Sequence, residues 1–293
     1  MKVVSIVNMK GGVTKTTTAT SIAKGLHDRG YKVLLIDADP QANATDIVAK
    51  IGNELTDKFI NEFTEENIKS QQDFFNKLND CLYDNYEISI NLKDVFKAPE
   101  SIKNVIRHSD IENLDYIPSA LSLAETKIKT VLNVDIDNKH ILNEAFEYIN
   151  DDYDYCIIDN APDDSIILTN VINVSDLVIV PIKCDKGSLK GLIVTINKLN
   201  RLQKEASRLG ININFDLKIL MTMINKNKTD RKISELFRKY CGDMMMNNEI
   251  RYRAKPANES SINNGYLIDT KLNVGYELGK LVDEIEEYFN RWD

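Results

Sequence analysis

A run of glycines, lysines and threonines near the start of the chain limits the possible folds more than any other feature. It follows a short apolar run at 3–7, which predicts a buried strand, and it precedes residues 19–25, which predict a helix. Paired glycines let backbone N–H groups turn toward an anion, and the start of a helix adds the positive end of its dipole. The layout therefore predicts a phosphate-binding loop, whereas a turn that binds nothing would leave two lysines and two threonines unexplained. The loop residues are Lys10, Gly11, Gly12, Val13, Thr14, Lys15, Thr16 and Thr17.

The side chains of this loop suit a nucleotide. Lys15 would supply a point charge to the phosphates, and the Thr16 hydroxyl a ligand to Mg²⁺. The loop departs from the general pattern G-x-x-x-x-G-K-[ST], because Met9 and Thr14 occupy the glycine positions and Lys10 is added at the front. It resembles the deviant Walker A motif of the ParA/MinD family of ATPases, K-G-G-x-x-K-[ST]. The resemblance implies that Lys10 reaches across a dimer to the partner's nucleotide, so that Lys10 and Lys15 both serve catalysis.

Composition adds a few exclusions. The 293 residues suit a single α/β domain, 1–293, with ordinary hydrophobic (43%) and charged (28%) contents. The formal net charge of −8 argues against a nucleic-acid binder over its whole surface but leaves room for a local basic patch. The four cysteines are far apart, which favours reduced thiols over zinc or disulfide sites. No apolar run has the length of a membrane span, and the first is too short for a signal peptide.

Two aspartates follow the next apolar run. Residues 33–36 predict a strand buried on both faces, and Asp37 and Asp39 come directly after it. Carboxylates at the carboxyl ends of parallel strands lie where open α/β sheets bind ligands, although a turn with a helix cap would also explain them. The run D-A-D-P-Q-A-N-A-T resembles the D-x-D-P-Q-x-N-x-T of ParA-type partition ATPases. That resemblance implies that Asp39 positions the attacking water and that Asp37 lies near the metal.

A third carboxylate ends the apolar run at 155–158. Asp159 has the Walker B arrangement, in which an aspartate at a strand end holds Mg²⁺, usually through water. The family's usual D-T-P-P is D-N-A-P in this chain, which leaves the details of the following loop open. We expect Thr16, Asp37 and Asp159 to form the metal site.

Residues from about 48 to 88 predict a helical acidic insertion into the family pattern. The stretch is polar, with apolar residues at roughly helical spacing. Two interpretations stay open: amphipathic helices packed on the main domain, or a segment that docks a partner.

Basic residues gather on two later helices, one ending near residue 209 and one at 231–239. Ordinary solvated helix faces and a strip that neutralises DNA phosphates are both consistent with them. The resemblance favours the strip, because partition ATPases bind DNA non-specifically through basic residues in this part of the chain. The candidate DNA-binding residues are Lys198, Arg201, Lys204, Arg208 and Arg238.

An asparagine follows the strand expected at 217–224. Asn225 resembles the residue with which the family recognises adenine, and a cap of a helix or turn is the alternative. The guanine-specific pattern N-K-x-D is absent, since residues 225–228 read N-K-N-K.

Taken together, apolar strands that alternate with helices predict an α/β fold with a doubly wound, mostly parallel sheet and helices on both faces, of the P-loop NTPase class. The resemblance implies a ParA-type DNA partition ATPase that uses ATP and Mg²⁺. It would form a homodimer with ATP, bind DNA non-specifically, and leave it when a ParB-like partner stimulates hydrolysis. The implied location is cytoplasmic and nucleoid-associated, without a membrane.

Two other functions use the same scaffold. A MinD-like membrane-positioning ATPase would carry a basic amphipathic helix at the end of the chain, but the helix expected at 275–292 has an acidic outer face. An iron–sulfur carrier or reductase would need cysteines that bridge a dimer, and the four cysteines offer no matching pair.

Overall fold

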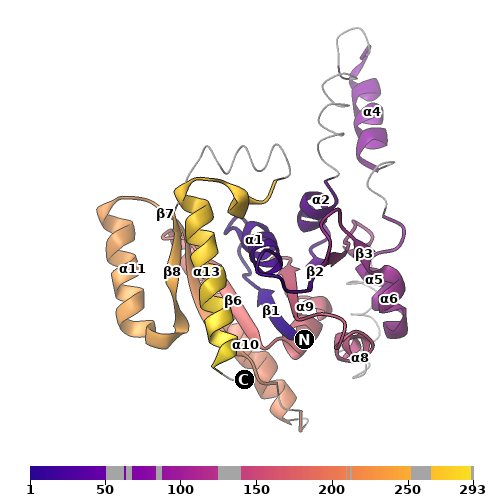
Figure 1. The fold of residues 1–293 in the computed structure, drawn as a ribbon. Helices are drawn as coiled ribbons and strands as arrows, with labels where there is room; N and C mark the ends of the chain where they lie inside the picture. The colour runs from indigo at the N-terminus through magenta and orange to yellow at the C-terminus, as the bar shows by residue number, and fades with distance from the viewer. Residues whose placement is uncertain are drawn as a thin grey trace.

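The structure is a computed structural model that describes residues 1–50, 63, 68–83, 88–124, 140–208, 210–211, 213–251 and 265–291. In this part of the chain, one sheet carries helices on both of its faces (Figure 1). The insertion predicted at 48–88 lies partly outside the described residues, and its described part contains a helix, α4 (Gln71–Tyr83), that stands away from the sheet.

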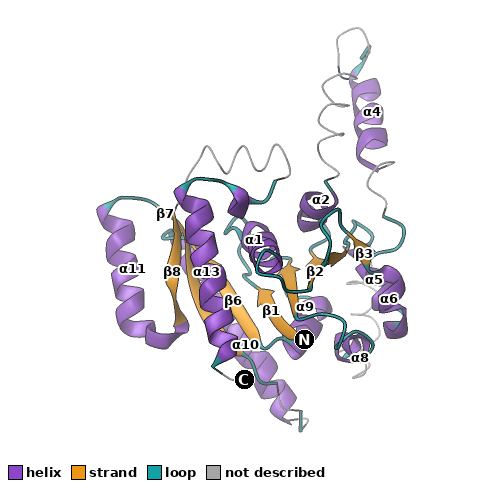
Figure 2. Ribbon diagram, viewed as in Figure 1, coloured by secondary structure: helices purple, strands orange, loops and turns teal. Residues whose placement is uncertain are grey.

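The sheet has the strand order β3-β4-β2-β5-β1-β6-β7-β8 among the described residues (Figure 2). Neighbouring strands are parallel except for β3 and β4. The doubly wound, mostly parallel sheet predicted from the sequence is therefore confirmed. The strands are β1 (Lys2–Ile6), β2 (Val33–Ala38), β3 (Arg107–His108), β4 (Leu114–Ile117), β5 (Tyr155–Asn160), β6 (Leu177–Ile182), β7 (Asp216–Ile224) and β8 (Met245–Arg251).

Most connections between the strands contain helices. The remaining α-helices are α1 (Lys15–His27), α2 (Asn43–Ala49), α5 (Leu92–Val95), α6 (Ile102–Val105), α8 (Ile141–Glu147), α9 (Ile166–Val174), α10 (Lys186–Arg208), α11 (Lys228–Cys241) and α13 (Asn273–Asn290). Short 3₁₀ helices occupy Pro99–Ser101, Gly242–Met244 and Leu267–Asp269.

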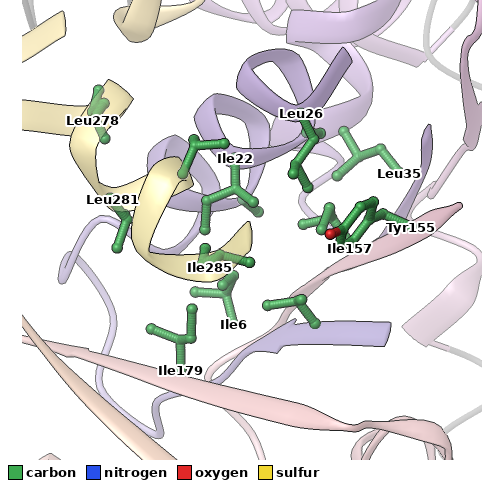
Figure 3. Close-up of a cluster of buried hydrophobic side chains, with 14 of the residues drawn as sticks. Ile6, Ile22, Leu26, Leu35, Tyr155, Ile157, Ile179, Leu278, Leu281 and Ile285 are labelled. Carbon is green, nitrogen blue, oxygen red and sulfur yellow. The ribbon is translucent and has the colours of Figure 1, made fainter. Parts of the chain in front are cut away.

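One face of the sheet packs against α1 and α13. The central strands are buried on both faces, so their residues alternate between two hydrophobic cores. Figure 3 shows the core beneath α1 and α13, where helix side chains such as Ile22 of α1 and Ile285 of α13 meet strand side chains such as Ile6. A Cβ on Gly25 would lie 2.6 Å from Val282 Cγ2, so this glycine allows the two helices to approach closely.

The opposite face is covered by α5, α6, α8 and α9 over one half, where their apolar residues form the second of these cores, and by α10 and α11 over the other half, where a third core lies. All strands of the described sheet except β3 run in the same direction, so their carboxyl ends meet at one edge. That edge carries the loops that follow β1, β2, β5 and β7.

Candidate functional site

The loop between β1 and α1 forms an open cradle. Gly11 and Gly12 are exposed, and a Cβ on either would meet nothing within 4 Å. Gly12 has φ +70° and Thr14 has φ +68°, so the loop turns through the left-handed region twice. Backbone N–H groups of such a turn can converge on an anion.

Helix α1 starts at Lys15, four residues before the helix predicted from the sequence. The sequence pattern did not predict this first turn, because the β-branched threonines in it have low helix propensity. No side chain caps the helix start, and the first turn carries no acidic residue. Its N–H groups are therefore available to the cradle, which suits a phosphate.

Lys15 lies at the base of the cradle with only 6% of its surface exposed. Burial lowers its pKa, and the negative charges of Asp159, Asp39 and Asp163 oppose the shift. Its ammonium donates one long hydrogen bond of 3.4 Å to the carbonyl of Lys10. A buried cation with so little local compensation can bind an incoming anion strongly.

Asp159 is the last residue but one of β5, near the strand end where the sequence predicted a carboxylate, and its charge acts on Lys15. It is 1% exposed, and neither carboxylate oxygen has a hydrogen-bond partner among the described residues. Burial and then the neighbouring charge of Asp37 raise its pKa well above the usual value, which the Thr16 hydroxyl and the Lys15 charge oppose. A buried carboxylate that accepts no hydrogen bond keeps its oxygens available as ligands for a hard cation such as Mg²⁺.

Asp37 faces Asp159 across the β2–β5 register. Its oxygens are already occupied, because one accepts both the Thr45 N–H and the Thr45 hydroxyl at 2.8 Å and the other accepts the Asp39 N–H at 3.1 Å. Burial raises the pKa of Asp37 to about 7 despite these bonds. The geometry therefore gives Asp37 a direct part in holding the loop after β2, close to the expected metal.

Asp39 lies half-buried at the mouth of the cradle. Its carboxylate accepts the Gln41 N–H at 3.0 Å, and its charge acts on both Lys15 and Asp159. One oxygen makes this local bond, so the carboxylate keeps capacity to accept a proton or orient a water. The structure thus brings Lys15, Thr16, Asp37, Asp39 and Asp159 to one edge of the sheet.

The described residues contain no cluster of three or more His, Cys, Asp or Glu side chains arranged as metal ligands. Mg²⁺ does not need such a cage, because it keeps several waters and uses one or two carboxylates together with substrate phosphates. Asp159, with the Thr16 hydroxyl nearby, fits that mode of binding.

Asn225 lies at the same edge, at the end of β7. Its backbone N–H and side-chain amide both donate to one oxygen of Asp230, at 2.8 and 3.1 Å. A cavity of about 560 Å³ opens beside it, lined by residues of the β7–α11 loop, α11 and β8 that include Arg231, Arg238 and Arg251. Asn225 therefore has a local structural role in this state, and adenine recognition stays a prediction.

Comparisons with known proteins agree with this geometry. A model of an AAA domain family, AAA_31, matches residues 1–219. The sporulation initiation inhibitor protein Soj of Bacillus subtilis is 31% identical over 83% of this chain and 81% of its own length. The chain belongs to the ParA family of P-loop NTPases. The chromosome partitioning protein ParA of Caulobacter vibrioides is 26% identical over 83% of this chain and 78% of its own length.

The fold agrees as well. A variant of McdA from Cyanothece, in complex with ATP, superposes with a TM-score of 0.71 and covers 99% of this chain and 96% of its own, at 18% identity. Among the described residues, no helix is long and apolar enough to cross a membrane.

The basic residues expected to bind DNA in this ParA-family chain do not form one uniform strip. Lys198 and Arg201 of α10 both pair with Asp164, and the Lys198 side chain is only 10% exposed. Arg238 of α11 donates to the carbonyls of Met246 and Asn247, which ties α11 to β8. Lys204 and Arg208 are exposed at the end of α10. The DNA assignment stays a prediction.

Some residues of the site have no role in the sequence-based prediction. Thr45 bonds Asp37 and accepts the Ser119 N–H at 3.0 Å, so it links α2, the end of β2 and the loop after β4. Asp163 lies near enough to Lys15 to oppose the fall in its pKa. The pair of carboxylates directly after the D-N-A-P loop is a signal in the sequence that could have indicated Asp163.

Proposed function

We propose that this ParA-family protein is an ATPase that partitions DNA. In this proposal, ATP and Mg²⁺ bind at the cradle and cause dimerisation, and the dimer binds DNA non-specifically in the cytoplasm, on the nucleoid. A ParB-like partner stimulates hydrolysis, which releases the dimer from DNA. The observation that carries the proposal is the buried Asp159, without hydrogen-bond partners, beside the buried Lys15 at a phosphate cradle.

The ligand chemistry follows from these two side chains. Lys15 would hold the phosphates together with the N–H groups of the cradle and the first turn of α1. Thr16 and Asp159 would hold Mg²⁺, with Asp37 supporting the site through its bonds to the loop after β2. The ATP complex of the McdA variant supports this choice of nucleotide. Asn225 would contact adenine after giving up part of its bonding to Asp230.

Hydrolysis needs a positioned water more than a strong base, because phosphoryl transfer depends mainly on positioning and charge stabilisation. Asp39 would accept a hydrogen bond from that water. Lys10 would stabilise the transition-state charge on the nucleotide of the partner protomer, as an arginine finger does.

Dimerisation through the face beside the cradle is supported by exposed apolar residues. Ile193 and Val194 of α10 are 60% and 54% exposed, although both are large aliphatic side chains. They lie on the helix that contacts Lys10. A second copy that covers them would remove apolar surface from water and bring the two cradles together.

One set of measurements tests this proposal. Asp39→Ala should bind ATP, form dimers seen by light scattering, and stay on DNA, with phosphate release suppressed even when a stimulating partner is present. A monomeric Asp39→Ala protein, or one that hydrolyses ATP at the parental rate, would remove Asp39 from catalysis.

The DNA-binding part has its own control. Lys204→Glu with Arg208→Glu should weaken DNA binding at low salt and flatten its salt dependence by about one unit of slope for each DNA phosphate that is no longer neutralised. Lys97→Glu with Lys103→Glu makes the same charge change at exposed positions on the other half of the molecule and should leave DNA binding unchanged. Equal effects of both pairs would mean that net charge, and no defined surface, governs binding. ATP-dependent binding to anionic vesicles in place of DNA would favour a membrane-positioning ATPase.

A further inference from the structure

The side chain of Lys10 lies along a face of α10 of the same chain, and the helix carries no side chains on that face. Gly187 and Gly191, one helical turn apart, form that face. A Cβ on Gly187 would lie 2.5 Å from Lys10 Nζ and 3.3 Å from Lys10 Cε, and a Cβ on Gly191 would lie 2.6 Å from Lys10 Cβ. No other residue type could stand at either position without moving the lysine. Glycine is unfavourable inside a helix, so its use at both positions needs a local reason.

The backbone before Lys10 is fixed on the same helix. The Met9 N–H donates to the Thr195 hydroxyl at 3.0 Å, one turn beyond Gly191. The Lys10 N–H donates to Asn8 Oδ1 at 2.8 Å, and the Asn8 amide donates to the Pro181 carbonyl at 2.8 Å. Lys10 therefore starts from a fixed point beside Gly191, and its side chain follows the helix surface toward Gly187.

A carboxylate lies at the far end of this path. Asp185 is exposed, just before α10, and its oxygens accept the N–H and the hydroxyl of Ser188 at 2.8 and 3.0 Å. These bonds and the nearby positive charge of Lys10 lower the pKa of Asp185. The ammonium of Lys10 thus ends between a bare helix surface and a negative charge of its own chain.

We infer that Gly187 and Gly191 are positioning residues for Lys10: they keep open a track on α10 that sets where its ammonium lies beside the cradle. Gly191 fixes the start of the side chain, and Gly187 leaves space for the ammonium. The importance of this position for hydrolysis rests on the proposed function, in which Lys10 acts on the partner's nucleotide. The placement of Lys10 by the two glycines is independent of it.

The two glycines differ in what a substitution would move. At Gly187 a methyl group meets the end of the flexible Lys10 side chain and lies 3.1 Å from Asp185 Oδ1, so side-chain shifts accommodate it, the fold survives and the ammonium moves. At Gly191 it also comes within 2.9 Å of Asn8 Oδ1 and meets the Lys10 Cβ, so the loop itself must shift. Gly187→Ala is therefore the informative variant. Gly279→Ala in α13 is its matched control, because a Cβ at that helical glycine meets nothing within 4 Å.

The first experiment reads the position of Lys10 directly in the nucleotide-free protein. Acetic anhydride is added in limiting amount, and labelling of Lys10 is followed by peptide mass spectrometry. Displacement from the track exposes the amine, so Gly187→Ala should label several-fold faster at Lys10 than the parent, whereas Gly279→Ala should match the parent. Equal Lys10 labelling in the parent and Gly187→Ala would overturn the inference.

The second experiment reads the consequence for turnover. Misplacing a catalytic group by about 1 Å can cost about 10²-fold in rate. Gly187→Ala should therefore lower kcat by about tenfold or more, with the KM for ATP and the melting temperature near parental values. In a Lys10→Ala background, Gly187→Ala should cause no further loss, and a further loss would overturn the inference, because the glycine would then not act through Lys10. If Lys10→Ala itself turns over at the parental rate, the proposed role of Lys10 is wrong, and the labelling result alone decides whether the glycines position it.

Discussion

Replacing Thr45 with valine tests how the edge of the sheet is held together. The Thr45 hydroxyl donates to Asp37 at 2.8 Å and accepts the Ser119 N–H at 3.0 Å, in a site where Thr45 is 1% exposed. Valine has nearly the same shape, so it leaves no cavity and removes only these two hydrogen bonds. The Thr45 N–H keeps its own bond to Asp37.

The expected cost follows from the two groups that lose a partner. A hydrogen bond to a charged group contributes about 1.5–3 kcal/mol, and a buried N–H left without a partner costs about 1–3 kcal/mol. Since the pKa of Asp37 is raised to about 7, its carboxylate is only partly charged near neutrality, which lowers the first contribution. We expect Thr45→Val to lose about 2–4 kcal/mol of unfolding free energy.

Urea unfolding at pH 7, where Asp37 is partly charged, measures this loss. Thr45→Ser keeps the hydroxyl and serves as the control, with most of the parental stability retained. A loss below about 0.5 kcal/mol for Thr45→Val, the size of an ordinary surface substitution, would refute the view that this hydroxyl links the end of β2 to the loop after β4.

Three further predictions concern the charged groups of the site. Lys15→Ala should abolish tight ATP binding in a fluorescent-nucleotide titration, because the buried counter-charge for the phosphates is lost; parental affinity would contradict the cradle assignment. Asp159→Asn should abolish the Mg²⁺ dependence of ATP binding, which chelation by EDTA reveals in the parent, and should raise the melting temperature of the nucleotide-free protein, since a buried unpaired carboxylate is removed. Asp37 has a folded-state pKa of about 7, above its unfolded value near 3.8, so the stability it contributes should be fully present below pH 4 and lost as the pH rises through 7. Asp37→Asn should flatten that part of the stability profile in urea titrations, and an unchanged slope would exclude Asp37 as its source.

The sequence was sufficient for the parts of the fold that depend on local pattern. Continuous apolar runs ending in Asp37 and Asp159 predicted two buried strands, and the structure places the two aspartates at one edge of the sheet, in register with each other. A strand, a glycine loop and Lys15-Thr16 predicted the cradle. These features could be predicted because each is specified within a few consecutive residues.

Contacts between distant segments could not be read in the same way. The Ser119 N–H that donates to the Thr45 hydroxyl lies 74 positions further along the chain, and the Lys10 side chain meets Gly187 of α10, so both contacts form only after folding. Basic residues at helical spacing look alike whether they face solvent or, as Lys198 does, pair with Asp164. The role of the two glycines on the bare face of α10 could not be predicted either, because a glycine in a helix is explained only by the residues that pack against it.

The electrostatics of the site favour the joint binding of a phosphate and a divalent cation. Burial disfavours the charged form of Lys15 and of Asp159 alike, and each is compensated only in part by the other. A phosphate alone would relieve Lys15 but add negative charge beside Asp37, Asp39 and Asp159. A cation alone would relieve the carboxylates but oppose Lys15. With both bound, Lys15 faces the phosphates and Asp159 faces the cation, so both burial costs fall together. We therefore expect the nucleotide and Mg²⁺ to increase each other's affinity by the same factor, as linkage requires.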